Sequence, residues 1–391
     1  MIRRKSRQNI VERTTLVARH ELLVLLIVWS GGIERTQSAF GSERDSRDIL
    51  DAAQWERLDL GVDRGLEYLA AQQREDGSFE TLPAGQPAIT SLCVMAFLSR
   101  GHVPAEGPYG DVVSRAIDFV LGIQQDDGLL YGLPIAPSFD QFNGSHTAIY
   151  NHAIAGLMLA EVYGMTDAAR QPRLREAIIK AIEFTRARQI APKGKRVDKG
   201  GWRYVRPYAA NDSDLSVTSW QLMFLRSAKN AEFDVPQKFI DEAMEYVRGC
   251  FDTMQSTFMY AESERRPSGG IVGGGILALA LGGEHHSKIA RTAGEWILAN
   301  RDRSYNGPGV HGLDRYHYST YYCSQAMFQL GGRYWATYYP EMMDTFLENQ
   351  RADGSWDPES VKDEPYGRTY TTALAILALT PPYQILPIYQ A

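Results

Sequence analysis

The sequence Gln350-Arg-Ala-Asp353-Gly354-Ser355-Trp356 decides the fold, because the chain repeats it. The stretch Gln73-Arg-Glu-Asp76-Gly77-Ser78-Phe79 matches it through the Gln, the Asp-Gly-Ser and the aromatic residue. A shorter copy covers residues 124–128, and three degenerate copies lie between residues 181 and 305. Each copy has an aromatic anchor before its turn, at Tyr68, Phe119, Phe184, Tyr246, Trp296 and Phe346. Successive anchors are 50 to 65 residues apart, a period that indicates a repeat architecture.

Each repeat contains two helices of different polarity. The segment before the Gln is amphipathic, as in residues 177–186, which indicates a helix with one buried stripe. The segment after the turn is apolar on nearly every side, as in residues 88–98, 153–160, 271–281 and 372–379. A helix that is apolar all round must be covered all round. We therefore expect six inner helices with six outer helices around them.

Six such units predict an all-α fold, a closed (α/α)6 toroid of twelve helices. An open array would need polar capping repeats, whereas the first and last inner helices are as apolar as the others. We assign residues 1–41 to a leader, 42–60 to a lead-in, 61–380 to the toroid and 381–391 to a C-terminal tail. The N-termini of the inner helices should gather at one mouth, around a cavity.

The repeated turn has a structural explanation. Asp-Gly supplies the residue with positive φ that a tight reversal needs. We expect the Gln side chain to hydrogen-bond the free carbonyls at the end of its own outer helix, with the Phe or Trp packed over it. The repeat residues are therefore not expected to be catalytic.

Composition and charge exclude several classes of function. The chain has 391 residues and a net charge of -6, which leaves no basic surface for nucleic acid. Cys93, Cys250 and Cys323 are far apart in the sequence, so they indicate neither a disulfide framework nor a thiolate metal site. We expect no metal and no cofactor.

The leader differs from the rest of the chain. Residues 1–41 carry a charge of +4, so the remainder carries -10, and residues 22–29 are all apolar. A basic stretch followed by an apolar run is typical of a secretory signal peptide; a disordered leader is the alternative. We expect export, to the periplasm or outside the cell. Eight apolar residues are too few to span a bilayer, so the mature chain should be soluble or a peripheral membrane protein.

The repeats resemble the glutamine-tryptophan repeats of squalene-hopene and oxidosqualene cyclases, in the terpenoid cyclase and protein prenyltransferase toroid superfamily. The similarity covers most of residues 61–380. It implies an α/α toroid, in agreement with the polarity of the helices. Cyclases of this type resemble two toroids joined around one substrate cavity, and this chain has room for one. A homodimer or a separate protein partner would be needed to close such a cavity.

The resemblance also implies a catalytic acid. Class II cyclases protonate an alkene with a buried Asp in an Asp-x-Asp-Asp-Thr motif. Asp212 and Asp214 match its first two carboxylates, but Leu215 replaces the third. The resemblance therefore implies that Asp214 donates the proton, supported by Asp212, from an incomplete motif. The alternative from the residues themselves is that this Asp-Ser-Asp caps an inner helix and stays ionised.

A zinc prenyltransferase is not supported. The resemblance would require an Asp-x-Cys pair and a distant His, but the sequence has Tyr321-Tyr322-Cys323, and no His at the start of the last inner helix. A catalytic zinc site needs its full set of ligands.

Aromatic residues gather where the inner helices begin. We predict that eight of them bind substrate: Tyr150, Trp202, Tyr204, Trp220, Tyr318, Tyr321, Tyr322 and Tyr370. Their ring faces would suit the cations of an isoprenoid. The alternative is that these large rings simply fill the funnel of the toroid.

These observations predict a single squalene-hopene-cyclase-like toroid that holds an isoprenoid or another apolar ligand, with Asp-initiated cyclisation, an isomerase activity, as the reaction. One alternative is a non-catalytic scaffold of the same fold that binds a ligand or a protein. Another is a secreted polysaccharide-active enzyme, which needs paired carboxylates across a cleft. The candidates for that pair are Asp140, Asp212, Asp214 and Glu262.

Overall fold

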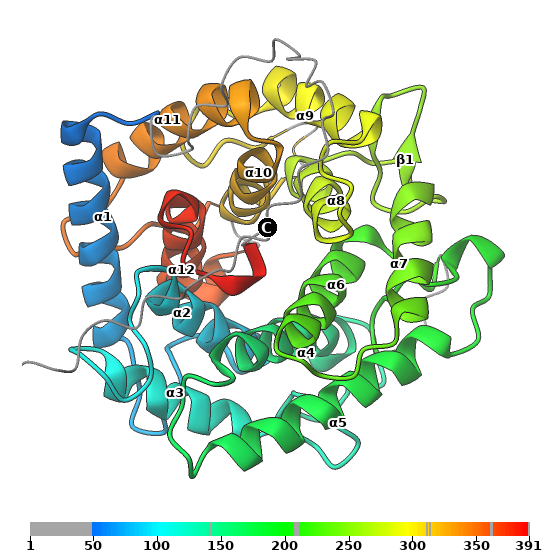
Figure 1. Ribbon diagram of the computed structural model, residues 1–391, viewed down its shortest axis with the longest axis horizontal. Coiled ribbons are helices and arrows are strands. Elements are labelled where there is room, and N and C mark those ends of the chain that lie inside the picture. The colour runs from blue at the N-terminus through cyan, green and yellow to red at the C-terminus, as the bar shows by residue number, and fades with distance from the viewer. Residues whose placement is uncertain are drawn as a thin grey trace, which may run out of the picture. The chain divides into compact units, whose positions relative to one another are not determined.

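Two concentric rings of helices make up the described part of the protein (Figure 1). The computed structural model describes residues 49–140, 142–206, 211–309, 312, 314–359 and 363–389, so the predicted leader lies outside it. The outer helices are α1 (Ala52–Ala71), α3 (Gly110–Gly122), α5 (Gln171–Ile190), α7 (Gln237–Gly249), α9 (Lys288–Asn300) and α11 (Gly332–Glu348). The inner helices are α2 (Ala88–Ser99), α4 (Gly144–Val162), α6 (Leu215–Asn230), α8 (Gly269–Leu281), α10 (Tyr316–Leu330) and α12 (Gly367–Leu379).

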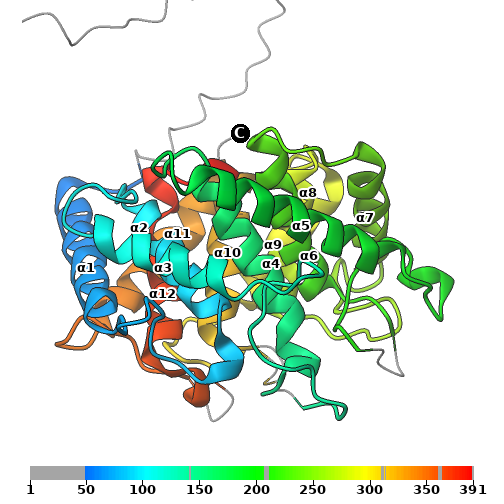
Figure 2. The same ribbon diagram turned by 90° about the horizontal axis from the view of Figure 1, so that it is seen from below.

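The predicted all-α toroid is confirmed. Each inner helix contacts the next, and α12 contacts α2, so the inner ring closes. The outer ring closes where α11 contacts α1. Figure 2 shows the two layers from the edge of the ring. The strands in the described residues are the two-residue β1 (Phe251–Asp252) and β2 (Thr257–Phe258), which pair as one antiparallel hairpin.

The two layers have the polarity that the sequence predicts. Every residue of α2 is buried, and α4 and α8 are buried along most of their length. An outer helix such as α7 buries one stripe, formed by Ala243, Met244, Tyr246 and Val247. Burial on all sides is available only inside a second layer, so the polarity of each helix selects its ring.

The repeat Gln links neighbouring outer helices. Its side-chain amide donates to the carbonyl of its own turn glycine and to a carbonyl of the next outer helix. The second acceptors are Val112 for Gln73, Ala177 for Gln124, Phe239 for Gln189 and Gly61 for Gln350, at 2.8 to 2.9 Å. The predicted bond to the Gln residue's own helix end is therefore wrong. In the first repeat, the carbonyls of Leu69 and Ala70 accept from the backbone of the turn instead.

The turn glycine is required by two constraints at once. Gly77, Gly128, Gly200 and Gly354 all have φ between +87° and +92°. A Cβ on any of them would lie 2.2 to 2.3 Å from a backbone oxygen of the next outer helix. Any side chain would strain the turn and would also push two outer helices apart.

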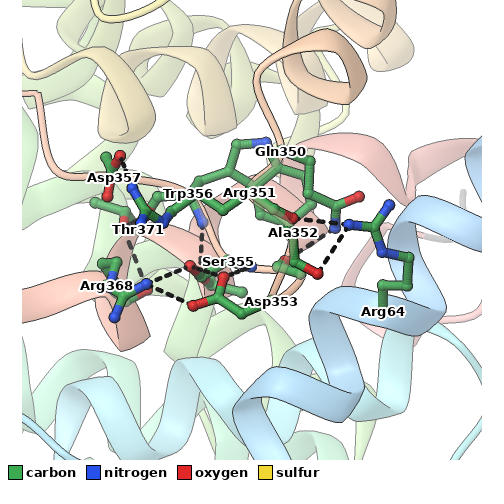
Figure 3. A network of polar contacts seen from close by, with 12 residues as sticks. Arg64, Gln350, Arg351, Ala352, Asp353, Ser355, Trp356, Asp357, Arg368 and Thr371 are labelled. Carbon is green, nitrogen blue, oxygen red and sulfur yellow. Dashed lines mark hydrogen bonds and ion pairs between the residues drawn. The ribbon is translucent and has the colours of Figure 1, made fainter.

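The last repeat closes the ring against the first helix (Figure 3). The amide of Gln350 bonds the Gly61 carbonyl of α1, and Arg64 of α1 donates to the Arg351 carbonyl over 2.7 Å. Beside them, Asp353 accepts from the Ser355 backbone and from Arg368 of α12. Residues at opposite ends of the sequence thus form one interface.

The first helix begins before the assigned start of the toroid, and the last inner helix, α12, ends at Leu379, close to the assigned end. The helix α1 begins at Ala52, inside the predicted lead-in, because Asp51 caps it in a capping box with Gln54. The predicted C-terminal tail packs against the C-terminal ends of the inner helices. The Tyr389 hydroxyl lies 2.6 Å from that of Tyr321 on α10, and the Ile388 amide donates to Glu161 of α4 over 3.2 Å.

Candidate functional site

A cavity of about 310 Å³ lies at the N-terminal ends of the inner helices, where the sequence predicts one. All six inner helices contribute to its lining. Its aliphatic lining includes Ile89, Leu92, Ile154, Ile271 and Leu374. The volume is at the lower end of the range for small-molecule sites, about 300–1,000 Å³. The site therefore suits a compact ligand.

Five of the eight predicted aromatic residues line this cavity: Tyr150, Tyr204, Trp220, Tyr318 and Tyr370. They come from α4, α6, α10, α12 and the loop before α6. The ring thus brings together residues that are up to 220 positions apart in the sequence.

The other three predicted aromatic residues lie outside the lining. Trp202 is fully buried, and its indole Nε1 donates to the Thr185 carbonyl of α5 over 2.8 Å, as Trp356 does to Phe346. Trp202 therefore belongs to the repeat turn. Tyr321 and Tyr322 are buried beneath the cavity, where Tyr321 stacks on Trp220 at 5.6 Å.

Sequence reasoning missed five aromatic or charged lining residues. Tyr260 and Arg266 precede α8, Asp314 and Arg315 precede α10, and Tyr366 precedes α12. Each lies before an inner helix. The aromatic candidates were chosen at the starts of the inner helices, so this position was the signal that could have identified these residues. Arg266 lies over the Tyr260 ring at 5.6 Å, so the rim of the cavity combines charge with aromatic faces.

A chain of hydroxyl groups crosses the cavity wall. Tyr150 of α4 donates to Ser216 of α6 over 3.2 Å, and the Ser216 hydroxyl lies 2.7 Å from that of Tyr318 on α10. The indole of Trp220 donates to the Tyr318 oxygen over 3.1 Å. Burial raises the pKa of Tyr318 to about 12, so its hydroxyl stays protonated near neutral pH.

Asp214 is the N-cap of α6. Its Oδ1 accepts from the Val217 amide over 2.8 Å, and its Oδ2 lies 3.7 Å from Arg203. The carboxyl is fully buried, and this burial raises its pKa to about 6, although Arg203, the Val217 amide and the Tyr260 hydroxyl all act to lower it. The predicted cap is present, and the pKa of its carboxyl is raised because desolvation outweighs these three contacts.

Neither predicted catalytic carboxylate is part of the cavity lining. Asp212 lies in the loop before α6, where its Oδ2 accepts from the Gly194 amide over 2.7 Å. Tyr204 and Tyr260, which lie beside Asp214, do line the cavity, and their hydroxyls lie 3.1 Å apart.

Comparisons with known proteins place the fold. Neither a family model nor a curated protein matches the sequence. A variant of the type II terpene cyclase MstE from Scytonema, in complex with geranylgeranyl dihydroxybenzoate, is 14% identical, with a TM-score of 0.55 over 86% of this chain and 100% of that one. A family 76 glycoside hydrolase from a bovine Bacteroides thetaiotaomicron strain is 12% identical, with a TM-score of 0.58 over 83% of this chain and 76% of that one.

The chain has the α/α toroid fold. The family 76 mannosidase Bt3792 from Bacteroides thetaiotaomicron shares it, at 13% identity and a TM-score of 0.55 over 83% of this chain and 98% of that one. These similarities support the predicted resemblance to terpenoid cyclase toroids at the level of the fold. They do not choose between the activities that toroids carry.

Asp314 is the carboxylate that lines the cavity of this toroid among the described residues. It is bonded to the Gly269 amide at the start of α8 and to the Ser319 hydroxyl. A glycosidase of the usual kind needs two carboxylates across its cleft. The candidates Asp140 and Glu262 are not among the lining residues that the structure describes.

A buried ionic cluster lies behind the cavity wall of the toroid. Arg315, which lines the cavity, is 3.0 Å from Asp363, and His317 Nδ1 is 2.7 Å from Glu359. Burial raises the pKa of Asp363 to about 7, with Glu359 also raising it and Arg315 lowering it. Burial lowers the pKa of His317 to about 3, so its imidazole is neutral. The cluster holds Arg315 in place at the cavity.

The residues that the structure describes contain no group of three or more His, Cys, Asp or Glu placed to hold a metal ion. None of their helices combines the length and apolar character needed to cross a membrane.

Proposed function

We propose that this toroid binds a small, mainly apolar molecule of the isoprenoid class in the cavity at the inner-helix N-termini. The observation that carries the proposal is the lining, in which aliphatic side chains surround one space together with Tyr and Trp rings from four inner helices and the segments before inner helices. Such walls bury apolar area and present ring faces to a compact hydrocarbon. The neighbour MstE, which holds a geranylgeranyl compound on the same fold, adds support.

Binding is tested by blocking the cavity. Ala88 of α2 lines the cavity, and Ala53 lies on the exposed face of α1. Titration calorimetry with farnesol and geranylgeraniol should detect binding to the unsubstituted protein and to Ala53→Phe. It should detect none with Ala88→Phe, whose larger side chain would occupy the ligand space. Equal binding by both variants would place the ligand elsewhere.

Asp-initiated cyclisation is the second candidate, favoured by one observation. The raised pKa of Asp214 leaves part of its carboxyl protonated near neutral pH, as a general acid requires. Its burial outside the lining weighs against direct proton transfer to an alkene. The test is to incubate squalene and shorter polyprenyl substrates with the protein and with Asp214→Asn, and to analyse products by gas chromatography with mass spectrometry. Equal product from both proteins, or none, would remove Asp214 from catalysis.

Binding of a ligand without formation of a product would support the alternative of a non-catalytic scaffold. The incomplete motif at Leu215, which is buried at the first position of α6, is consistent with it.

A further inference from the structure

The hydroxyl chain in the cavity wall has one more hydroxyl hydrogen than its own hydrogen bonds use. Tyr150, Ser216 and Tyr318 hold three hydroxyl hydrogens between them, and the two bonds that join them use two. The Trp220 indole supplies its own hydrogen to Tyr318 and cannot accept one. The Tyr322 hydroxyl also interacts with Tyr318: the contact raises the pKa of Tyr322 and lowers that of Tyr318, as expected if Tyr322 is the donor. Tyr322 thus uses its own hydrogen on Tyr318, and one hydroxyl hydrogen of the other three groups is left over. Because Tyr150 donates to Ser216, this hydrogen belongs to the Ser216–Tyr318 pair.

The helix backbone does not take up this hydrogen. A helical Ser commonly donates to the carbonyl four residues earlier, as Ser219 does to Leu215 over 2.8 Å. The corresponding carbonyl for Ser216 is that of Asp212, which accepts instead from Lys193 over 3.2 Å. The left-over donor thus has no acceptor within α6.

The surroundings of the pair define what an acceptor must be. Ser216, Tyr318 and Tyr150 all line the cavity together with aliphatic residues such as Ile154 and Leu374. A donor that faces an apolar space without a partner is unfavourable, and an oxygen delivered by a ligand would remove that cost. A pure hydrocarbon would fill the same space and leave the donor unmet.

We propose that the natural ligand is an oxygen-bearing isoprenoid, such as an alcohol or a ketone, whose oxygen accepts a hydrogen bond from the Ser216–Tyr318 pair. This inference rests on the proposed isoprenoid-binding function and narrows its ligand class. It places the ligand oxygen against α6 and α10, with the hydrocarbon part along the aliphatic wall.

The experiment compares farnesol with the hydrocarbon farnesene, which has the same carbon skeleton, by titration calorimetry. We expect farnesol to bind the unsubstituted protein more tightly by about 2- to 10-fold, the effect of one neutral hydrogen bond. A triple variant, Tyr150→Phe with Ser216→Ala and Tyr318→Phe, should bind the two compounds equally and keep its affinity for farnesene. Retained farnesene binding also shows that the variant is folded.

One single variant serves as the matched control. Tyr321→Phe, one turn along α10, should keep the preference for farnesol, because that hydroxyl bonds Tyr389 outside the cavity.

The remaining outcomes overturn one proposal or the other. Equal affinity of the unsubstituted protein for farnesol and farnesene, or an unchanged ratio in the triple variant, would overturn the assignment of an oxygen acceptor and leave isoprenoid binding intact. Binding of neither compound would contradict the proposed function itself.

Discussion

The side-chain amide of Gln350 donates a hydrogen bond of 2.8 Å to the backbone carbonyl of Gly61, 289 residues earlier in the chain. Gln73, Gln124 and Gln189 make the same bond to the next outer helix, so Gln350 completes a set that runs around the ring. The fourth and fifth repeats lack the Gln. Among these bonds, that of Gln350 is the one that joins the last repeat to the first helix.

We expect Gln350→Leu to lower the free energy of unfolding by about 1 to 3 kcal/mol, because two hydrogen bonds to backbone carbonyls are lost. Urea denaturation measures this change. The control is Gln72→Leu, since the Gln72 side chain makes no hydrogen bond to another described residue. An equal loss in both variants would show that the bridge to Gly61 does not stabilise the ring.

Gly354→Ala should destabilise the protein by about 3 kcal/mol or more. It combines an unfavourable positive φ with a Cβ placed 2.2 Å from the Arg64 carbonyl. Gly122→Ala, at the end of α3, meets nothing within 4 Å and should be nearly neutral. Thermal unfolding of the two variants gives the comparison, and similar melting temperatures would contradict the role assigned to the turn.

Because of Asp214, the free energy of unfolding should fall as the pH rises from about 4 to 6. Its pKa is raised in the folded state to about 6, so the folded state binds more protons than the unfolded state in this range. Asp214→Asn should remove about 2 to 3 kcal/mol of that change. Urea denaturation at several pH values measures it. Ser268→Ala removes the N-cap of α8 and should lower stability equally at each pH; an equally reduced slope in that variant would attribute the effect to capping alone.

The C-terminal segment should contribute to stability through the bond between Tyr389 and Tyr321. Their hydroxyls are 2.6 Å apart and both residues are buried. Single Tyr→Phe changes at either position should each cost about 0.5 to 1.5 kcal/mol, and the double variant should cost little more than one of them. A double-mutant cycle by urea denaturation tests this. Fully additive losses would mean that the two hydroxyls act independently.

The repeats and the polarity of the helices were sufficient to predict the two rings, because both are local properties of the sequence. A helix that is apolar on all sides, such as α2, must be buried on all sides, and this can be read from its own residues. The position of the cavity followed from the same argument, since the inner-helix N-termini share one end of the ring. The cap at Asp214 was also a local signal, an Asp directly before an apolar helix.

The details of the site could not be predicted in this way. Trp202 and Trp220 both lie near the start of α6, but Trp202 bonds α5 within the repeat turn whereas Trp220 lines the cavity. Tyr260 and Arg315 reach the cavity through loops whose paths depend on distant helices. No sequence pattern distinguishes these orientations.

The sequence by itself determined that this chain forms a closed two-layer ring with six inner helices around a cavity. Only the tertiary structure decided which carbonyl each repeat Gln would reach, which aromatic rings would face the ligand space, and that Asp214 would be buried enough to raise its pKa to about 6. The physical reason is the distance along the chain over which each effect acts. Helix polarity and capping act over a few residues, whereas hydrogen bonds to another helix and desolvation of a carboxyl depend on groups that the closed ring brings together.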